Sequence, residues 1–279
     1  MDLQQIGAGH AAIKRVIDLQ RNTAPNPTLM FVAEGLWAHN ALLETGTPID
    51  TFFWCPEASY SDEAQLRARQ SIERAKRSFQ ISAKTLARVA EREKPDGLLS
   101  ITQLPYWTPR DITLPETALV LVADGIEIPG NLGTLIRTMD GCAADLLVMV
   151  NRRTRLTHPK VFRASHGMVL SVPTIEFDSV PQASAWLRER GFTVLLADAN
   201  TDQSYRDVTY DQRTAIVLGN ERYGFSKEWR DEPFAPIRLP MLGRADSLNV
   251  SIAGAIFLYE ARARMGRSDT EQLADPSSS

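Results

Sequence analysis

The sequence is poor in the residue types that usually build disulfide or metal frameworks. Among 279 residues there are only two cysteines and four histidines, and they are Cys55, Cys142, His10, His39, His158 and His166. Neither set shows the paired spacing of a disulfide framework or of a metal site. We therefore expect free thiols and no metal ion.

Long hydrophobic runs are missing as well. No stretch approaches the roughly 18–20 apolar residues that cross a bilayer, and the first residues, MDLQQIGAGHAAIKRV, contain no apolar signal core. Unpaired cysteines are typical of a reducing compartment. Together these features predict a cytoplasmic protein without a membrane partner.

A strong charge of one sign is the third absence. The 31 Lys and Arg residues are nearly balanced by 34 Asp and Glu residues, which leaves a formal net charge of −3. Net charge therefore gives no case for nucleic-acid binding, and a nucleic-acid partner would have to use local basic patches. The length and the 43% hydrophobic content predict a globular chain of about two domains.

The first part of the chain mixes helical and strand patterns. Apolar spacing predicts helices over 10–21 and 33–44, and the long polar segment 60–93 suggests two more helices. Short apolar runs predict strands at 50–55 and 96–104. We expect a small α/β domain over 1–105, followed by a proline-containing linker over 106–117.

The second part alternates strands and helices regularly, which predicts a mainly parallel sheet covered by helices on both faces. The expected strands are 118–123, 145–150, 172–177, 192–197, 214–219 and 236–240, and the expected helices are 131–142, 159–170, 181–190 and 248–264. This domain spans 118–265. The last residues, 266–279, lack apolar periodicity and are expected to be a disordered tail.

Three polar clusters follow strands of this predicted sheet, where ligands bind in open α/β folds. The first, DGIEIPGNLGTLIRTMDG at 124–141, contains Asn131 and Arg137. The second is GNERYGFSKEW at 219–229. The third, MLGRADSLNVSIAGAIFLYEARAR at 241–264, places polar residues at the start of an apolar helix.

Each cluster also has a purely structural explanation. Asn131 and Ser247 stand where helix N-caps are expected. Arg137 and Glu221 could be solvated surface charges. A helix that is apolar on nearly every side, as at 248–264, most simply indicates a fully buried helix. Taken singly, these residues do not separate structure from function.

Taken together, the clusters resemble the SpoU/TrmH family of the SPOUT superfamily of RNA methyltransferases. NLGTLIR at 131–137 matches the family's first motif, and GNERYGFS at 219–226 matches the second, with Asn220 where serine is commoner. The third motif is matched by IRLPM at 237–241 and SLNVS at 247–251. The segment HPKVFRASHG at 158–167 is also similar to a family segment. The likeness is close over 117–265 and looser over FVAEGLWAHNALL near the N-terminus.

The resemblance implies a methyltransferase that uses S-adenosylmethionine to methylate a ribose 2′-hydroxyl of RNA. It also implies a homodimer, an RNA-binding first domain, and a trefoil knot formed by about 240–262. These features come from the resemblance, since periodicity alone predicts an ordinary unknotted sheet. Residues 126–129, IEIP, are closer to the thiopeptide-resistance branch, which favours ribosomal RNA; transfer RNA is the alternative.

The resemblance also assigns residues. The implied cofactor-binding residues are Leu218, Gly219, Asn220, Gly224, Ile237, Met241, Leu248 and Asn249. The implied catalytic residues are Asn131, Arg137, Glu221, Ser247 and Asn249. The family's proposed base corresponds to Arg137, but a guanidinium keeps its proton up to very high pH. We therefore expect Arg137 to bind a phosphate of the target nucleotide, while the others orient the hydroxyl.

RNA contacts must come from local basic segments. One is 67–92, which carries Arg67, Arg69, Arg74, Lys76, Arg77, Lys84, Arg88 and Arg92. The second carries Arg152, Arg153, Arg155, Lys160 and Arg163 and leads into the family-like segment. Phosphate contacts by either segment predict binding that weakens steeply with salt. The histidines, which lack metal-ligand spacing, are expected to be solvated or to contact RNA.

Two other functions stay open at this point. The chain could be a catalytically silent RNA-binding member of the fold, or a nucleotide-binding enzyme that acts on a small molecule. The presence of all three motifs argues against the first. The second lacks its usual fingerprints, because the sequence contains neither G-x-G-x-x-G spacing nor a phosphate-binding G-x-x-x-x-G-K-[ST] loop.

Overall fold

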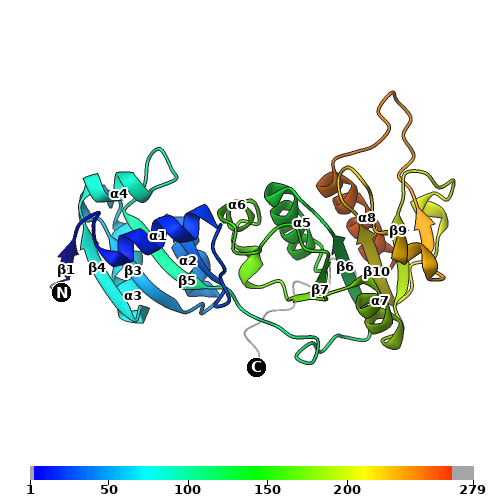
Figure 1. The fold of residues 1–279 in the computed structure, drawn as a ribbon, viewed down its shortest axis with the longest axis horizontal. Coiled ribbons are helices and arrows are strands. Elements are labelled where there is room, and N and C mark those ends of the chain that lie inside the picture. Colours follow the sequence, from blue (N-terminus) through cyan, green and yellow to red (C-terminus); the bar gives the residue numbers. More distant parts are fainter. Residues whose placement is uncertain (1–2, 266–279) are drawn as a thin grey trace. The chain divides into compact units, whose positions relative to one another are not determined.

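The computed structural model describes residues 3–265, which form two compact units (Figure 1). Unit 1 comprises the chain up to Tyr106 together with Leu156–Ser171. Unit 2 comprises Trp107–Arg155 and the chain from Val172 onward. The expected domain boundary falls close to this division, but the second domain is not continuous, because 156–171 belongs to unit 1.

Unit 1 is built on a mixed five-stranded sheet with the order β1-β4-β3-β5-β2. β1, β4 and β3 are parallel neighbours, whereas β5 runs antiparallel to β3 and β2. The strands are β1 (Gln4–Ile6), β2 (Met30–Glu34), β3 (Ile49–Trp54), β4 (Arg77–Ile81) and β5 (Leu98–Gln103). The helices are α1 (Ala11–Arg21), α2 (Leu36–Glu44), α3 (Asp62–Arg74), α4 (Ala83–Val89) and α6 (Pro159–Ala164), with short 3-10 turns at Pro56–Ala58 and Met168–Leu170.

Side-chain caps set the starts of several helices in unit 1. Ser61 and Ser82 accept hydrogen bonds from backbone N–H groups in the first turns of α3 and α4, and His10 does the same for α1. His39, by contrast, is fully buried: its Nδ1 lies 2.8 Å from the Gly35 carbonyl and its Nε2 2.8 Å from Ser100 Oγ. His39 is therefore a structural histidine, and our expectation of a solvated one is wrong.

Two element predictions in unit 1 need correction. The expected helix over 33–44 starts only at Leu36, because 30–34 forms strand β2. Gly35, with φ +93°, separates the strand from the helix. The expected helical pair over 60–93 is interrupted by β4, whose segment RSFQI alternates polar and apolar residues. A two-residue period over so short a segment is easily hidden between helical patterns.

Unit 2 is a six-stranded sheet with the order β11-β9-β10-β6-β7-β8, and every neighbouring pair is parallel. The strands are β6 (Ala118–Asp124), β7 (Leu146–Val150), β8 (Thr174–Glu176), β9 (Thr193–Ala197), β10 (Arg213–Leu218) and β11 (Ala235–Ile237). The helices are α5 (Pro129–Gly141), α7 (Val180–Glu189) and α8 (Val250–Arg264), with 3-10 turns at Tyr205–Asp207 and η4 (Lys227–Asp231). The predicted parallel α/β architecture is confirmed.

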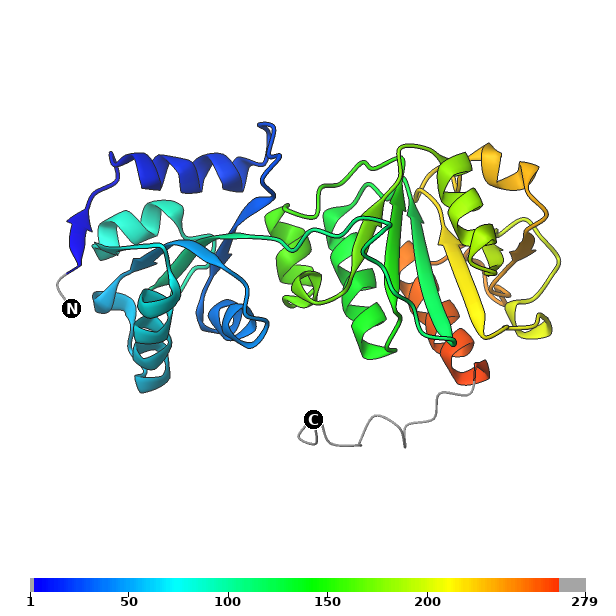
Figure 2. The ribbon, with the colours of Figure 1, turned by 90° about the horizontal axis from the view of Figure 1, so that it is seen from below.

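Helices cover both faces of this sheet (Figure 2). On one face, Val120 and Val122 of the central strand β6 share a buried cluster with Trp186 and Leu187 of α7. α8 packs against α5, β6 and β10. Strands β6 and β7 are buried on both sides, which explains why they are almost entirely apolar in sequence.

Two further differences concern the segments around unit 2. The expected linker over 106–117 is not free along its whole length, since Trp107, Ile112 and Leu114 pack against the core of unit 2. The expected disordered tail over 266–279 lies outside the described residues.

Helix α8 is not buried all round as its composition suggests. Ile252 is 51% exposed, Ile256 36% and Tyr259 54%. At a spacing of four and three residues, these side chains form one apolar stripe along the helix. One face of α8 is thus left uncovered by residues 3–265.

Candidate active site

A cavity of about 840 Å³ opens in unit 2 at the carboxyl ends of β9, β10 and β11. All three polar clusters of the sequence line it: Asn131 of the first, 218–225 of the second, and 246–250 of the third. This is the edge of a parallel sheet where ligands are expected. The segment between β11 and α8, orange in Figure 1, extends away from the sheet beside this cavity.

A chain of hydrogen bonds joins the three clusters. Asn131 Nδ2 donates to Glu221 Oε1 at 2.9 Å, and Asn249 Nδ2 donates to Asn131 Oδ1 at 3.2 Å. Asn249 Oδ1 in turn accepts from the backbone N–H of Ser251 at 2.9 Å and from its hydroxyl at 2.6 Å. Residues that lie up to 118 positions apart in sequence are thereby held in one network.

The carboxylate of Glu221 accepts three hydrogen bonds. Besides Asn131, the backbone N–H groups of Glu127 and Ile128 donate to it at 3.2 and 3.3 Å. Burial by itself would raise the pKa of Glu221, but these hydrogen bonds outweigh burial and hold the pKa below its usual value. Glu221 is therefore suited to fixing the loop before α5, and poorly suited to accepting a proton at neutral pH.

The turn after β10 is closed on itself. Asn220 and Gly224 exchange two backbone hydrogen bonds of 2.9 Å, and Asn220 Oδ1 accepts from the N–H groups of Arg222 and Tyr223. A Cβ on Gly219 would stand only 2.0 Å from the backbone nitrogen of Phe225, so no other residue fits there without moving the backbone. Gly224, with φ +70°, adopts a conformation that favours glycine.

A buried carboxylate anchors the far end of this turn. Asp124, at the end of β6, accepts from the N–H of Ser226 at 2.6 Å and from the Trp229 indole at 3.2 Å. Its other oxygen accepts from Asn151 Nδ2 at 2.8 Å. Asp124 is not among the residues predicted from the sequence, although its position at the end of an apolar strand is a usable signal.

The residues expected to bind the cofactor gather at one place. Leu218, Gly219, Asn220, Gly224, Ile237, Met241, Leu248 and Asn249 all line the cavity. Four of the five expected catalytic residues line it too, and they are Asn131, Glu221, Ser247 and Asn249. Ser247 is exposed and its hydroxyl donates to Asp246 at 3.2 Å.

Arg137 does not line this cavity. It is exposed on α5 and has no hydrogen bond or ion pair with another side chain in the part of the chain that the structure describes. A cation held this way is available to an external anion.

The expected N-caps are wrong in both cases. Helix α5 begins at Pro129, so Asn131 lies inside its first turn. Helix α8 is capped by Asn249, which accepts from Ser251, and not by Ser247. A proline is favoured in the first turn of a helix, which moves the start of α5 upstream of Asn131.

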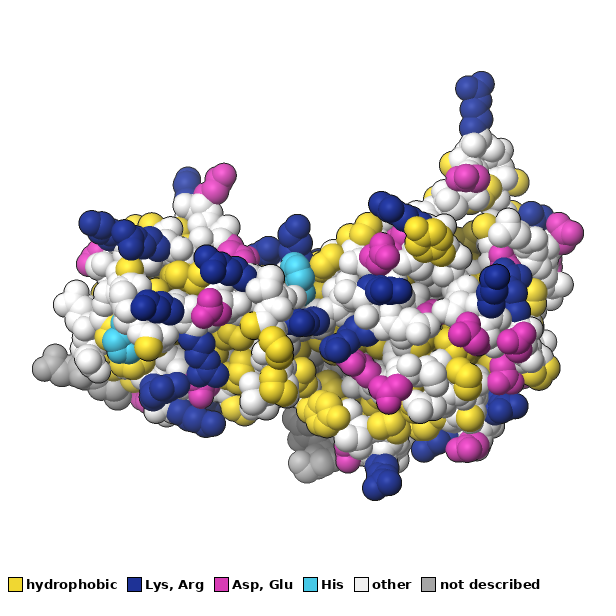
Figure 3. Space-filling model, viewed as in Figure 1, with side chains coloured by type: hydrophobic (Ala, Val, Ile, Leu, Met, Phe, Trp, Pro, Cys, Tyr) yellow, Lys and Arg dark blue, Asp and Glu magenta, His cyan; other side chains and the backbone are white. Residues whose placement is uncertain are grey.

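The expected RNA-binding residues are divided between the two units. Arg152, Arg153 and Arg155 belong to unit 2, whereas Lys160 and Arg163 belong to unit 1. Arg152 pairs with Glu176 at 3.4 Å, and Arg163 pairs with Glu91. Lysine and arginine side chains are interspersed with acidic ones over the face shown in Figure 3.

The cavity also has charged residues that the sequence analysis missed. Asp198, which follows β9 and is 7% exposed, forms a 2.8 Å ion pair with Arg230. Arg238, which follows β11, lines the same wall, and its Nε is buried without a partner among the described residues. Both Asp198 and Arg238 lie just beyond strand ends, so the strand-end rule could have found them.

Within residues 3–265, no helix is long and apolar enough to cross a membrane. In the same range, no group of three or more histidine, cysteine, aspartate or glutamate side chains is placed to hold a metal ion.

Sequence comparison identifies the family. Residues 118–259 match the SpoU rRNA methylase family, and the chain belongs to it. A relative from Staphylococcus epidermidis, described as a TrmH family tRNA/rRNA methyltransferase, is 34% identical over 141 residues. That match covers 50% of this chain and 57% of the relative, so the chain spans little more than half the length of this relative.

Solved structures resemble the whole chain. An AdoMet-bound rRNA methyltransferase from Sinorhizobium meliloti is 27% identical, with a TM-score of 0.83, and the alignment covers 93% of this chain and 97% of that one. A second structure, described as an RNA 2′-O ribose methyltransferase, is 26% identical with a TM-score of 0.78, and covers 94% and 99%. The similarity therefore includes the part of unit 1 before residue 107, which the family match does not reach.

Proposed function

We propose that this protein transfers a methyl group from S-adenosylmethionine to a ribose 2′-hydroxyl of RNA, with ribosomal RNA as the substrate. The observation that carries the proposal is the hydrogen-bond chain from Glu221 through Asn131 to Asn249, which brings the three family motifs onto one cavity. The S. meliloti relative, an AdoMet-bound rRNA methyltransferase, supports the cofactor and the substrate class. The second solved structure supports the ribose target.

The cavity suits this cofactor in size and chemistry. Its volume of about 840 Å³ lies in the usual range of small-molecule sites, about 300–1,000 Å³. Apolar side chains such as Leu218 and Ile237 can contact an adenine ring, and the backbone of the Gly219 turn offers polar groups close by. Arg238, whose Nε is buried without a partner and whose terminal nitrogen lies 3.9 Å from Asp202, and the carboxylate of Asp198 suit the opposite charges of an amino-acid group.

The protein's own residues would act mainly by positioning. S-adenosylmethionine, when bound, supplies a methyl group activated by a sulfonium. Glu221 holds the loop before α5 and orients Asn131, while Asn249 joins Asn131 to the start of α8. Holding two reactants in line can lower a barrier by several kcal/mol without acid–base chemistry. Glu221 is in this scheme a positioning residue.

Arg137 is proposed to bind a phosphate of the target nucleotide. Its side chain is exposed and has no acidic partner among the described residues, as a phosphate contact requires. A guanidinium matches phosphate geometry with two parallel donors. Its very high pKa in proteins opposes the role of general base.

The protein is further proposed to act as a homodimer. The exposed stripe of Ile252, Ile256 and Tyr259 on α8 is an apolar surface that a second copy would cover. RNA contacts are proposed for Arg152, Arg153, Arg155, Lys160 and Arg163, and for the basic segment 67–92. The trefoil knot over about 240–262 is proposed from the family resemblance.

Two measurements test the function. Calorimetric titration with S-adenosylhomocysteine should give one saturable site per chain, and no binding at high micromolar concentration would refute the methyltransferase proposal. Incubation with radiolabelled S-adenosylmethionine and separate ribosomal and transfer RNA pools should label ribosomal RNA. Labelling of transfer RNA alone would show that transfer RNA, and not ribosomal RNA, is the substrate. Mapping the label to a base would refute the ribose target.

A further inference from the structure

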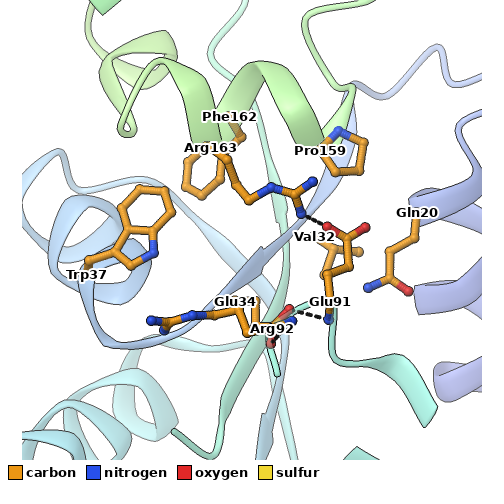
Figure 4. A pocket seen from close by; sticks show the side chains of 9 residues that line it. All are labelled: Gln20, Val32, Glu34, Trp37, Glu91, Arg92, Pro159, Phe162 and Arg163. Atoms are coloured by element: carbon orange, nitrogen blue, oxygen red, sulfur yellow. Dashed lines mark hydrogen bonds and ion pairs between the residues drawn. The ribbon is translucent and has the colours of Figure 1, made fainter. Parts of the chain in front are cut away.

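Unit 1 contains a second, smaller cavity, of about 80 Å³, that methyl transfer does not use. Its lining residues come from α1, β2, α2, the segment after α4, and α6. Figure 4 shows Pro159, Phe162 and Arg163 of α6 across the opening from Glu34 and Arg92, with Trp37 and Gln20 at its two ends. The cavity exists only because 156–171 packs on unit 1.

Aromatic contacts hold the α6 wall in place. Trp37 stacks on Phe162 with 5.1 Å between ring centroids, and on His166 with 5.0 Å. Phe162 also packs against Phe31 of β2 at 4.8 Å. Phe162 is buried by these contacts, so the half-buried Trp37 at the end of the cavity is the ring that is accessible to a base. Proteins commonly stack unpaired nucleobases on accessible aromatic rings.

The polar groups of the cavity offer free acceptors. Glu34 accepts from the backbone N–H groups of Glu91 at 2.8 Å and Arg92 at 3.3 Å, and no cationic side chain of the described chain forms an ion pair with it. A carboxylate accepts about four hydrogen bonds, so capacity remains. Gln20 donates through Nε2 to the Val89 carbonyl at 2.6 Å, which leaves its Oε1 as an acceptor.

Two acidic and two basic residues line the cavity, namely Glu34, Glu91, Arg92 and Arg163, and this balance argues against both an anion such as phosphate and a cation as the ligand. Arg163 pairs with Glu91, and Arg92 pairs with Asp96 at 3.0 Å. Burial raises the pKa of Glu34 to about 7. The backbone N–H and the charge of Arg92 oppose this shift, as does the charge of Arg163, whereas the charge of Asp96 adds to it. A phosphate would face Glu34 and Glu91, and a cationic side chain would face Arg92 and Arg163. A neutral group that donates hydrogen bonds suits the cavity better.

We propose that this cavity binds the Watson–Crick edge of an unpaired guanine of the RNA substrate, with Glu34 as its acceptor. Guanine presents N1–H and the 2-amino group side by side, and two parallel donors match the two oxygens of one carboxylate. Adenine and cytosine present a single amino group on this edge, and uracil a single N–H. A cavity of about 80 Å³ admits the edge of a base and not a whole nucleotide. The proposal rests on the proposed function in so far as RNA supplies the base.

Nucleotide binding to the full-length protein tests this site. At pH 8, where Glu34 is ionised, GMP should bind saturably and about tenfold more tightly than IMP, which lacks only the 2-amino group, and than AMP, CMP or UMP. Saturating S-adenosylhomocysteine should leave GMP binding unchanged, because the proposed site is in unit 1. Equal affinity for GMP and IMP, no GMP binding, or displacement of GMP by S-adenosylhomocysteine would overturn the proposal.

Variants locate the site. E34Q replaces an acceptor oxygen by a donor and should lower GMP affinity about tenfold, whereas the exposed neighbour variant E93Q should not change it. If E34Q fails to fold, the wild-type comparison of GMP with IMP still decides. S-adenosylhomocysteine binding is measured in the same samples. Absence of S-adenosylhomocysteine binding by the wild type refutes the methyltransferase proposal, whereas absence of guanine preference in a wild type that binds S-adenosylhomocysteine refutes only the guanine site.

Discussion

Single residues carry most of the geometry of the active site, and Gly219 is the clearest case. We expect G219A to destabilise the protein by about 2–3 kcal/mol, because the new methyl group would meet the backbone of Gly224 and Phe225 at 2.0–2.1 Å. Urea unfolding measures this loss, and S-adenosylhomocysteine affinity should fall with it. G130A is the matched control, since no described atom lies within 4 Å of its added Cβ. Equal stability of the two variants would contradict the prediction.

The lowered pKa of Glu221 predicts that the stability of the fold depends on pH. Its pKa is lowered in the folded protein, since hydrogen bonds from Asn131 and two backbone N–H groups outweigh burial. A lowered carboxyl pKa stabilises the fold above the unfolded pKa of about 4.3, and this contribution is lost as the pH falls through the folded pKa. The stability difference between wild type and E221Q, measured by urea unfolding from pH 7 to pH 3, should therefore shrink toward pH 3. The exposed variant E228Q should show no such change, and a constant E221Q difference would refute the assignment.

Substitution of Arg137 distinguishes phosphate binding from general-base catalysis. R137K keeps a positive charge but loses the two-pronged donor geometry, so a phosphate contact predicts weaker RNA binding with turnover at saturating RNA close to normal. Single-turnover kinetics over a range of RNA concentrations measure both quantities. A collapse of the saturating rate with unchanged RNA affinity would support the role as base. S-adenosylhomocysteine binding serves as the control and should not change.

At this scale the sequence predicts residues that the structure brings to one cavity, but it does not predict the hydrogen bonds between them. The motifs identify Asn131, Glu221 and Asn249, because these residue types recur at fixed positions after strands. Their mutual hydrogen bonds could not be predicted, since partners 90 and 118 positions apart meet only once the sheet order is known. Asp198 stands outside the three motifs and Arg238 is not among the residues that the third motif assigns, so only their positions directly after β9 and β11 could have indicated them.

At the scale of elements, the exposed face of α8 leads to a prediction about the oligomeric state. I256K places a charge in the middle of the exposed stripe of Ile252, Ile256 and Tyr259, and should convert a dimer to a monomer because an apolar interface does not tolerate an unpaired charge. Light scattering at several protein concentrations measures the change. L66K, which alters an exposed leucine of α3 in unit 1, should leave the dimer intact. A wild-type monomer would refute the dimer proposal itself.

Element prediction succeeded where periodicity was long and failed where it was short. The strands of unit 2 were found because central parallel strands are continuous apolar runs. β1 has three residues and β4 five, too few to establish a period against neighbouring helices. The exposed face of α8 could not be predicted, since composition does not tell whether an apolar face is covered by the same chain or by another.

For the whole molecule, α6 links distant parts of the sequence. F162A removes a buried ring that packs on Phe31 and Trp37, and should destabilise unit 1 by about 3–5 kcal/mol. Hydrogen exchange should therefore rise in β2 and stay unchanged in α5. K160A, an exposed change on the same helix, is the control. Unchanged protection of β2 would show that α6 contributes little to unit 1.

Because 156–171 belongs to unit 1, truncated fragments and chimaeras of this protein need two separate cuts in the sequence. The polypeptide passes from one unit to the other three times, after Tyr106, Arg155 and Ser171. A gene fragment that ends at 106 encodes the first unit without α6, and leaves Phe31 and Trp37 uncovered. A chimaera that exchanges only the N-terminal part would join a foreign first unit to the native α6, unless 156–171 is exchanged with it. In this protein the unit of exchange is two separate stretches of sequence.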